Sequence, residues 1–338
     1  MRRHRSKLKR APLVVVGLAL LPLLAACTPP DSFRAITPQG LTIQHLFEFE
    51  MVLSALVFLL VVGILVYVLL RYRGRPGDGE PRQVHGNRAI EIIWTATPFG
   101  IVTLLFVLSL LTMNVVRASA PPSNALTIRV IGHQWYWEYQ YPDLHIDTAD
   151  ELYVPINTPL HLEVQSVDVI HSFWVPQFGW KIDAIPGRTN VMDLQVSQAG
   201  TYQGSCTQFC GNEHAWMRTL VIAEPVGQFQ TWAQQQATPA TAATPSAEVA
   251  RGEQLFMSST CVSCHAIAGT PAQGTVGPNL THVGSRQILG GGVLTNTQAN
   301  MERWISGAQQ VKPGILMPSY NLPAADIKAL AAYLEGLK

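Results

Sequence analysis

Two cysteines, a histidine and a methionine lie close together near the middle of the chain. Cys206 and Cys210 supply two thiolates, His214 supplies an imidazole and Met217 supplies a thioether. Soft sulfur ligands combined with imidazole suit copper sites that transfer electrons. A single blue-copper ion needs only one thiolate, so the second cysteine indicates two metal ions bridged by both sulfurs. A disulfide is the alternative in an oxidising compartment, and the histidine and methionine that follow argue against it.

A dinuclear site of this kind requires a second imidazole, and His171 is the candidate. It precedes Cys206 by 35 residues, which is about the gap between paired strands of a small β-barrel. Taken alone, such a histidine would be assigned as a buried polar side chain. His171 becomes a predicted metal ligand only because the downstream loop supplies the other ligands.

A second pair of cysteines lies in the C-terminal segment, as Cys261-Val-Ser-Cys264-His265. Cys-x-x-Cys-His is the attachment sequence of c-type haem, with the thiols adding to the vinyl groups and the histidine binding iron. Met317 is the predicted second axial ligand, because a thioether favours ferrous iron and raises its potential. Met301 competes, but it lies in an expected amphipathic helix and is assigned to core packing. A zinc or redox Cys-x-x-Cys pair is the alternative.

The composition indicates a membrane protein. Of 338 residues, 13% are charged and 48% are hydrophobic, and a net charge of +1 gives no case for nucleic-acid binding. Met51–Leu70 and Trp94–Met113 are uncharged and match the thickness of a bilayer. Arginines crowd the loop between them and mark the cytoplasmic side: Arg71, Arg73, Arg75, Arg82 and Arg88. Everything after Met113 is therefore expected outside the cytoplasm, on the periplasmic side of a bacterial inner membrane.

The N-terminus predicts export. Six basic residues within the first ten precede an apolar run that ends in Leu24-Ala-Ala-Cys27. This pattern is typical of a signal peptide, predicted over residues 1–26, and its end resembles the lipobox of bacterial lipoproteins, which implies lipidation of Cys27. A third membrane helix is the alternative, but the run is shorter than the roughly 20 residues of a span.

The remaining chain divides by pattern. Residues 27–120 hold the N-terminal segment and the two spans, with no histidine inside either span. Short alternating strands punctuated by Pro and Gly predict a β-sandwich or barrel over residues 121–226. Residues 227–247 are rich in Gln, Ala, Thr and Pro and predict a flexible linker. Helical patterning follows over residues 248–338.

Several motifs occur in the order of one known family. They are Gly132-His-Gln-Trp-Tyr-Trp137, His171-Ser-Phe-Trp-Val-Pro176, Asp183-Ala-Ile-Pro-Gly-Arg188 and the segment from Cys206 to Met217. With the hairpin, they resemble subunit II of cytochrome c oxidase. The segment after residue 248 resembles class I cytochromes c, including Gly277-Pro-Asn-Leu280, so the whole is similar to caa-type oxidases. The resemblance implies a two-helix transmembrane hairpin, a cupredoxin-like β-barrel or sandwich and an all-α cytochrome c domain.

The resemblance assigns the metal ligands. It implies that Cys206 and Cys210 bridge the two coppers of a CuA centre and that His171 and His214 bind one copper each. Met217 and the main-chain carbonyl of residue 208 are implied as weak axial ligands. Many family members have Glu at this last position, where its side chain reaches a magnesium ion. This chain has Gln208, and because an amide is a poorer ligand for a hard cation, a magnesium site stays open.

The resemblance also assigns roles outside the metal clusters. It implies that Trp135 is the surface aromatic through which electrons reach copper. Asp183 and Arg188 are implied at the contact with subunit I, although an ordinary surface turn is the alternative. Glu91 matches a glutamate at the mouth of a proton channel. The carbonyl of Pro278 is implied to orient His265.

The implied activity is that of a respiratory oxidoreductase and translocase. Electrons from a cytochrome c or an upstream respiratory complex would pass through the fused haem and the copper pair to subunit I, which reduces oxygen with proton translocation. Other oxidase subunits and membrane lipid are the further partners, and a flexible tether would raise the local concentration of haem near copper. The alternatives are a copper-free quinol oxidase subunit, nitrous-oxide reductase and a free electron-carrier lipoprotein. The intact copper ligand set argues against the quinol oxidase subunit, and the membrane hairpin argues against nitrous-oxide reductase. The Glu91 and Asp183–Arg188 motifs would have no purpose in a free electron carrier.

Overall fold

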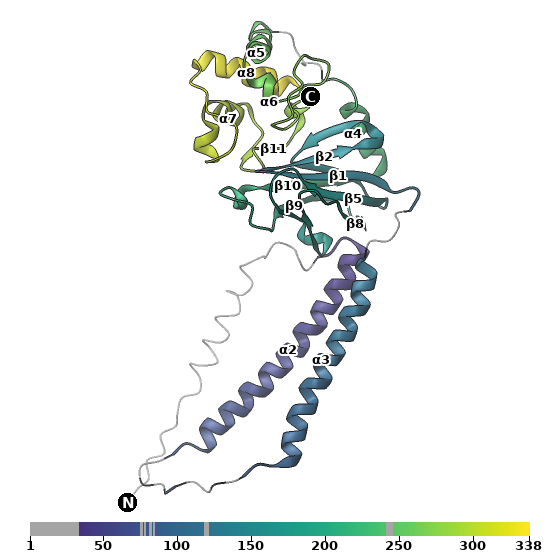
Figure 1. Ribbon diagram of the computed structural model, residues 1–338, viewed down its shortest axis with the longest axis vertical. Coiled ribbons are helices and arrows are strands. Elements are labelled where there is room, and N and C mark those ends of the chain that lie inside the picture. The colour runs from purple at the N-terminus through teal and green to yellow at the C-terminus, as the bar shows by residue number, and fades with distance from the viewer. Residues whose placement is uncertain are drawn as a thin grey trace, which may run out of the picture.

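The computed structural model describes residues 34–74, 77, 79–80, 83, 85–117, 122–240 and 246–338. The predicted signal peptide and the lipidation of Cys27 lie outside these residues. A pair of long helices leads to a β-sandwich, and a cluster of helices lies on the far side of that sandwich (Figure 1). We call residues 122–236 the sandwich domain and residues 246–338 the helical domain.

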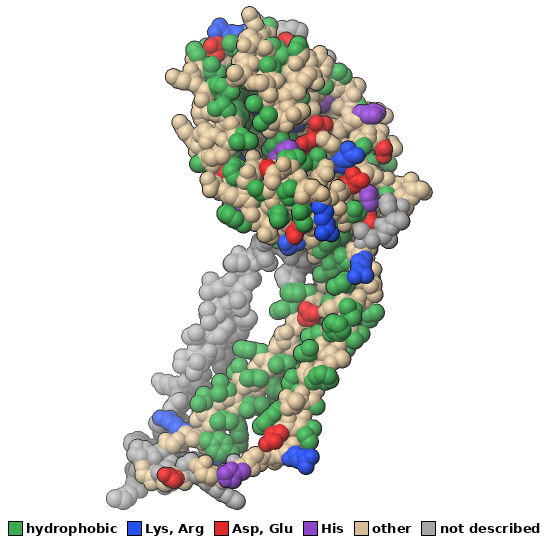
Figure 2. All heavy atoms as spheres, in the orientation of Figure 1, with side chains coloured by type: hydrophobic (Ala, Val, Ile, Leu, Met, Phe, Trp, Pro, Cys, Tyr) green, Lys and Arg blue, Asp and Glu red, His purple; other side chains and the backbone are tan. Residues whose placement is uncertain are grey.

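The long helices are α2 (Pro38–Arg71) and α3 (Arg88–Val116). Both are long and apolar enough to cross a membrane, and their apolar side chains are exposed along the whole hairpin (Figure 2). Both are longer than the predicted spans, because Thr37 and Asn87 cap the helices well outside the uncharged runs. A hairpin with this exposed apolar surface fits a bilayer better than water.

The first residues before and inside α2 fasten the hairpin to the sandwich domain. Ile36 N–H donates to the Gln177 carbonyl at 2.9 Å, and the Ile36 carbonyl accepts from Ser197 N–H at 2.8 Å. The Thr37 hydroxyl donates to the Phe178 carbonyl at 2.8 Å. These buried bonds orient the sandwich domain relative to the helix pair, and therefore relative to a membrane.

Two five-stranded sheets form the sandwich domain, in the orders β3-β2-β1-β5-β8 and β4-β10-β9-β6-β7. The first contains β1 (Leu126–His133), β2 (Tyr136–Tyr141), β3 (Ile146–Ala149), β5 (Pro159–Ser166) and β8 (Asn190–Gln195). The second contains β4 (Glu151–Pro155), β6 (His171–Trp174), β7 (Lys181–Ala184), β9 (Gly200–Cys206) and β10 (Arg218–Glu224). Short 3₁₀ turns are η1 (Pro142–Leu144), η2 (Pro176–Phe178) and η3 (His214–Trp216). Buried and partly exposed residues alternate along β5, so the core lies between the sheets.

Helix α4 (Val226–Gln236) replaces the first part of the predicted flexible linker. Phe229 and Ala233 are buried against the sandwich, and the Trp232 ring stacks on Tyr153 with centroids 4.4 Å apart. These apolar residues follow helical spacing among glutamines and threonines. The linker prediction over residues 227–247 is therefore corrected: its first ten residues form a helix that packs on β4 and β2.

The helical domain contains α5 (Ala247–Ser258), α6 (Cys261–Cys264), η4 (Val283–Ser285), α7 (Gln298–Val311) and α8 (Ala324–Gly336). Strands β11 (Ile288–Leu289) and β12 (Leu294–Thr295) add a small hairpin to an otherwise helical fold. Helix α5 crosses α8 in close contact, because a Cβ at Gly252 would lie 2.0 Å from the Ala329 carbonyl oxygen. Phe256 and Tyr333 pack beside this crossing, with ring centroids 6.0 Å apart.

Candidate metal centres

The predicted copper ligands converge at one end of the sandwich domain. His171 begins β6, Cys206 ends the neighbouring strand β9, and the β9–β10 loop carries the other ligands. The Cys206 sulfur is 3.9 Å from His171 Nδ1 and 3.8 Å from the Cys210 sulfur. The Cys210 sulfur is 3.5 Å from His214 Nδ1 and 3.9 Å from the Met217 sulfur. Strand pairing thus joins residues that are distant in sequence into one cluster.

The cluster suits metal rather than a disulfide. A sulfur–sulfur distance of 3.8 Å is far longer than the roughly 2.05 Å of a disulfide bond, and both cysteines are free. The Gln208 carbonyl lies 3.2 Å from the Cys206 sulfur. Each imidazole faces a different sulfur, so the donor set has two ends around a central sulfur pair. The thiolates, the thioether and the imidazoles are soft or borderline donors, which favours copper.

The two thiols do not ionise alike. The Cys210 thiol, which hydrogen-bonds the Cys206 sulfur, is the largest cause that lowers the pKa of Cys206, to about 4. The same hydrogen bond with Cys206, followed by burial, in turn raises the pKa of Cys210. The cluster therefore carries one thiolate before any metal binds, and a bound cation would displace the second proton.

Asp168 orients the imidazole of His171. The Asp168 Oδ1 carboxylate oxygen accepts from His171 Nε2 at 2.8 Å, so Nδ1 points at the sulfurs. Burial lowers the pKa of His171, but the hydrogen bonds with Asp168 and Cys206 outweigh burial and raise it. A carboxylate behind a metal-ligating histidine fixes its tautomer and its ring orientation. The sequence analysis missed Asp168, although a carboxylate three residues before a ligand histidine is a usable signal.

The second cluster surrounds a cavity in the helical domain. His265 Nδ1 donates to the Pro278 carbonyl at 2.8 Å, which leaves Nε2 free to bind a metal. A Cβ at Gly277 would lie 2.6 Å from His265 Cε1, so this loop can approach the imidazole only as glycine. Burial is the largest cause that lowers the pKa of His265. A neutral imidazole is the form that binds iron.

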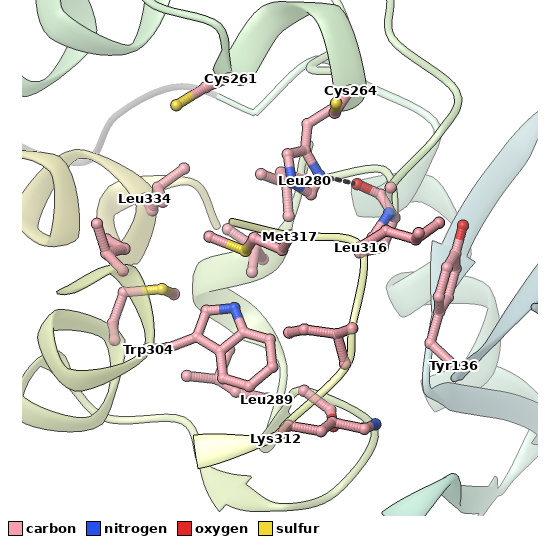
Figure 3. Close-up of a pocket in the computed structure, with 18 of the residues that line it drawn as sticks. Tyr136, Cys261, Cys264, Leu280, Leu289, Trp304, Lys312, Leu316, Met317 and Leu334 are labelled. Atoms are coloured by element: carbon pink, nitrogen blue, oxygen red, sulfur yellow. Dashed lines mark hydrogen bonds between the residues drawn. The ribbon is translucent and has the colours of Figure 1, made fainter. Parts of the chain in front are cut away.

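Met317 and the cysteines border the same cavity. Figure 3 shows Met317 and Trp304 extending into it, with Cys261 and Cys264 on another side. Gln309 Nε2 donates to the Met317 carbonyl at 2.8 Å and steadies this loop. Met301 also borders the cavity but is 2% exposed within the core of the helical domain. The assignment of the axial ligand to Met317 stays a prediction.

The cavity fits a haem in chemistry. Its walls are largely apolar, with Leu255, Phe256, Leu280, Leu289, Ile305 and Leu330 among them. Arg286 also borders the cavity, and its Nε atom is buried without a hydrogen-bond partner. Its Nη2 donates to the Asn279 carbonyl, and Asp147, Asp150 and Glu151 interact with its charge. The remaining Nε–H, at the margin of an apolar cavity, suits an anionic group at the edge of a haem. The pair of thiols, the imidazole and the thioether complete the donor set.

Trp135 lies between the copper cluster and the haem cavity, and its burial differs from the prediction. It was expected on the surface, but it is 9% exposed because the helical domain covers it. Its Nε1 donates to the Cys210 carbonyl at 3.0 Å, and its ring packs over Gly211, where a Cβ would lie 2.8 Å from it. Trp135 and Tyr136 border the haem cavity from the sandwich side, and Figure 3 shows Tyr136 there. Trp135 thus contacts both candidate metal centres.

The other predicted residues lie away from the clusters. Asp183 pairs with Lys181 at 3.1 Å on an exposed part of the sandwich domain, and Arg188 borders the same surface groove. Glu91 lies in the first turn of α3, and α3 begins at the end of the hairpin away from the sandwich (Figure 1). The Oε1 of Glu91 accepts from Asn87 N–H at 3.2 Å. In the structure this glutamate completes the cap of α3. Its predicted proton role is not tested by that contact.

Comparisons with known proteins match the chain over nearly its full length. The model of the transmembrane domain of cytochrome c oxidase subunit II matches residues 33–112, that of its periplasmic domain residues 144–224, and that of cytochrome c residues 249–338. Cytochrome c oxidase subunit 2 of Alkalihalophilus pseudofirmus is 36% identical over 93% of this chain and 94% of its own. The chain belongs to the cytochrome c oxidase subunit 2 family. It is subunit II of a haem-copper terminal oxidase with a fused cytochrome c domain.

Further relatives agree with this membership. The Bacillus subtilis subunit 2 is 30% identical over 96% of this chain and 97% of its own. The periplasmic domain of the Bradyrhizobium japonicum subunit II is 34% identical over 34% of this chain and 95% of its own, with a TM-score of 0.33. The families imply copper and haem c, a membrane anchor and association with other oxidase subunits. The predicted fold class, family and oxidoreductase function are confirmed.

Proposed function

We propose that this subunit II carries electrons from an external cytochrome c, or an upstream respiratory complex, to the oxygen-reducing subunit I. When bound, the haem and a dinuclear copper centre would supply the two redox steps. The observation that carries the proposal is the copper cluster: two free thiols 3.8 Å apart, each facing a different imidazole. A donor set with two such ends fits two metal ions better than one.

The ligand roles follow from this arrangement. Cys206 and Cys210 would hold the copper centre through both sulfurs, and His171 and His214 would each bind through Nδ1, the nitrogen nearer to sulfur. Met217 and the Gln208 carbonyl lie close enough to the sulfurs to act as weak outer ligands. The cluster is buried, with Cys206 and Cys210 at 5% and 3% exposure. Burial in a rigid sandwich limits reorganisation between redox states.

Cys261 and Cys264 would attach the haem through their sulfurs, and His265 and Met317 would bind its iron. The Pro278 carbonyl fixes the imidazole through Nδ1. Trp135 supports the electron route, because it borders the haem cavity and hydrogen-bonds the Cys210 carbonyl. A contiguous route of this kind needs no diffusion between the two redox groups.

The membrane-facing roles are proposed on placement. The arginine-rich loop orients the hairpin with the sandwich and helical domains on the periplasmic side. Glu91 then lies on the cytoplasmic side, as a channel mouth requires, and Asp183 and Arg188 lie together on a groove available to subunit I. Lipidation of Cys27 would add a second anchor. Magnesium at Gln208 is not part of the proposal, because a neutral amide binds it weakly.

Electron paramagnetic resonance of the full chain, with haem attached and copper added, tests the proposal. We expect one unpaired electron shared over two copper nuclei, together with a low-spin haem signal. Cys210→Ser should convert the shared signal into that of an isolated copper ion or abolish it. The matched control Cys264→Ser should change the haem signal and leave the copper signal intact. A signal from an isolated copper ion in the unmodified protein would contradict the dinuclear assignment.

A further inference from the structure

Lys312 is a buried cation between the two domains. It is 1% exposed, and its ammonium group donates to three carbonyl oxygens: Trp135 at 2.7 Å, Trp216 at 2.9 Å and Gly290 at 2.8 Å. A lysine has three donor hydrogens, so all of them are satisfied. Two of the three acceptors belong to the sandwich domain. The lysine comes from the helical domain, directly after α7.

The two acceptors in the sandwich domain frame the copper cluster. Trp216 lies in the β9–β10 loop, between the ligands His214 and Met217. Trp135 donates through its ring to the carbonyl of Cys210. Because each carbonyl belongs to backbone that carries or supports ligands, the ammonium group connects the helical domain to the frame of the copper cluster.

Three successive glycines allow the domains to approach this closely. Gly290, Gly291 and Gly292 have φ values of +62°, +72° and +80°, a region that disfavours other residues. A Cβ at Gly291 would lie 3.0 Å from both the Trp135 and the Trp216 carbonyl oxygens. The Gly291 carbonyl accepts from Arg218 N–H at 3.0 Å. The backbone of this turn therefore pairs directly with the start of β10.

Buried carboxylates complete the contact from the sandwich side. Asp150 is 5% exposed and accepts from Gly291 N–H at 3.0 Å. Glu151 is 1% exposed and accepts from Ile288 N–H at 3.0 Å and from Gln287 N–H. Burial lowers the pKa of Lys312, and among the acidic groups the charge of Asp150 does most to offset this. Buried charges are retained where both partners are in place, so these groups are built for one docked arrangement.

From these contacts we infer that Lys312 is a positioning residue, which locks the helical domain onto the sandwich domain with the haem cavity against Trp135. Electron transfer from haem to copper then occurs within a fixed interface and does not depend on random encounters of a tethered domain. The inference deepens the proposed function and rests on it for the electron-transfer step. The docking itself rests only on the contacts described above.

Lys312→Met in the assembled oxidase tests the inference. Methionine keeps a long apolar side chain and removes every donor. After rapid reduction of the haem, we expect electron transfer to copper to slow by about tenfold or more, because small misplacements are costly at a redox interface. The haem absorption spectrum and its reduction by ascorbate should not change. Amide hydrogens of Ile288 and Gly291 should exchange faster, and this second readout is independent of any metal.

Lys328→Met is the matched control. Lys328 lies on α8 of the same domain, with its side chain 58% exposed, and pairs with Glu248 at 3.2 Å. The same change of charge there should leave both the transfer rate and the amide exchange at their unmodified values. Gly291→Ala is the second variant, to be used if Lys312→Met loses its haem spectrum. It should separate the same contact by steric conflict and give the same two changes.

The outcomes separate the two proposals. Unchanged transfer and unchanged exchange in a folded Lys312→Met oxidase would overturn the positioning role. Faster exchange with unchanged transfer would show docking that electron transfer does not need, and would also overturn it. Failure of the unmodified oxidase to reduce copper from haem, with slow exchange at Gly291, would instead contradict the proposed electron route.

Discussion

The copper cluster and the haem cavity are built in opposite ways. The copper ligands come from two paired strands and one loop of a closed sandwich, whose core is filled by Trp137, Tyr139 and Phe173. The haem cavity is bordered by residues of α5, α6, α7, α8 and intervening loops, and many of these residues also form the core of the helical domain. The copper cluster occupies one end of a sandwich whose core is filled by side chains. The helical domain instead has its core around a cavity that the haem would fill.

This difference predicts unequal dependence on the metal groups. Backbone ladders hold the strands of His171 and Cys206 whether or not copper is present. In the helical domain, α5 and α8 cross in close contact through Gly252 and Ala329. Many of the other buried core residues of this domain also line the haem cavity. Removing haem should therefore loosen most of its domain, while removing copper should leave its domain folded.

The largest effect is expected from a Cys261→Ala, Cys264→Ala double variant produced in the full chain. Without attached haem, an apolar cavity remains open, at a cost of about 5 kcal/mol or more. Hydrogen exchange should rise throughout the peptides between α6 and α7, while those of the sandwich domain keep their protection. The paired control is Cys206→Ser with Cys210→Ser, which abolishes copper binding and should raise exchange only in the β9–β10 loop. An equal loss of hydrogen-exchange protection in both domains would contradict the proposed difference between the copper and haem domains.

The next largest effect is expected from a substitution in helix α4. This helix packs on the sandwich and extends the part of the molecule that folds without a cofactor. Trp232→Ala removes the ring that stacks on Tyr153 and lies edge-on to Tyr141. We expect the free energy of unfolding of the sandwich domain to fall by about 2–3 kcal/mol, since the ring is partly buried. Thermal unfolding measures the change. Gln234→Ala, on the exposed side of α4, should have almost no effect, because alanine is a good helix former. A similar loss there would show that the effect is not specific to the Trp232 ring.

Asp168→Asn sharpens the comparison within the copper cluster. The amide keeps the size of the side chain but removes the negative charge that faces His171 Nε2. Loss of such a support lowers metal affinity by roughly 10–100-fold. Competition with a copper chelator should show that loss while the circular dichroism of the sandwich domain stays unchanged. Asp193→Asn is the matched control, because Asp193 pairs with His161 at 2.6 Å in the same domain without a metal ligand.

The sequence predicted those features whose signal is local. Cys-x-x-Cys-His, the spacing from Cys206 to Met217 and the two uncharged runs each depend on neighbours in the chain, and the structure brings the predicted ligands together. The packing of α4 was missed because its few apolar residues are diluted by glutamine and threonine. Its helical spacing at Phe229, Trp232 and Ala233 was the available signal.

The contact between the domains had no such signal. Lys312 donates to main-chain carbonyl oxygens. Because every residue has such an oxygen, no sequence pattern identifies the partners of Lys312. The burial of Trp135 follows from the same contact and could not be predicted without it. Asp150 and Glu151 look like an ordinary acidic pair until Gly291 and Ile288 are placed against them.

The smallest expected effect tests helix α5, which crosses α8 in close contact at Gly252. Ser246 caps α5, and its hydroxyl accepts from Val249 N–H at 3.1 Å. Ser246→Ala should lower the free energy of unfolding of the haem-bound helical domain by about 1 kcal/mol. Denaturant unfolding followed by haem absorption gives this value, with Ser306→Ala on exposed α7 as the control. If α5 and α8 form without haem, the same loss should appear in the haem-free double variant, as faster exchange confined to α5 and α8. Unchanged hydrogen exchange in the haem-free variant would mean that the crossing of α5 and α8 also forms only when haem is attached.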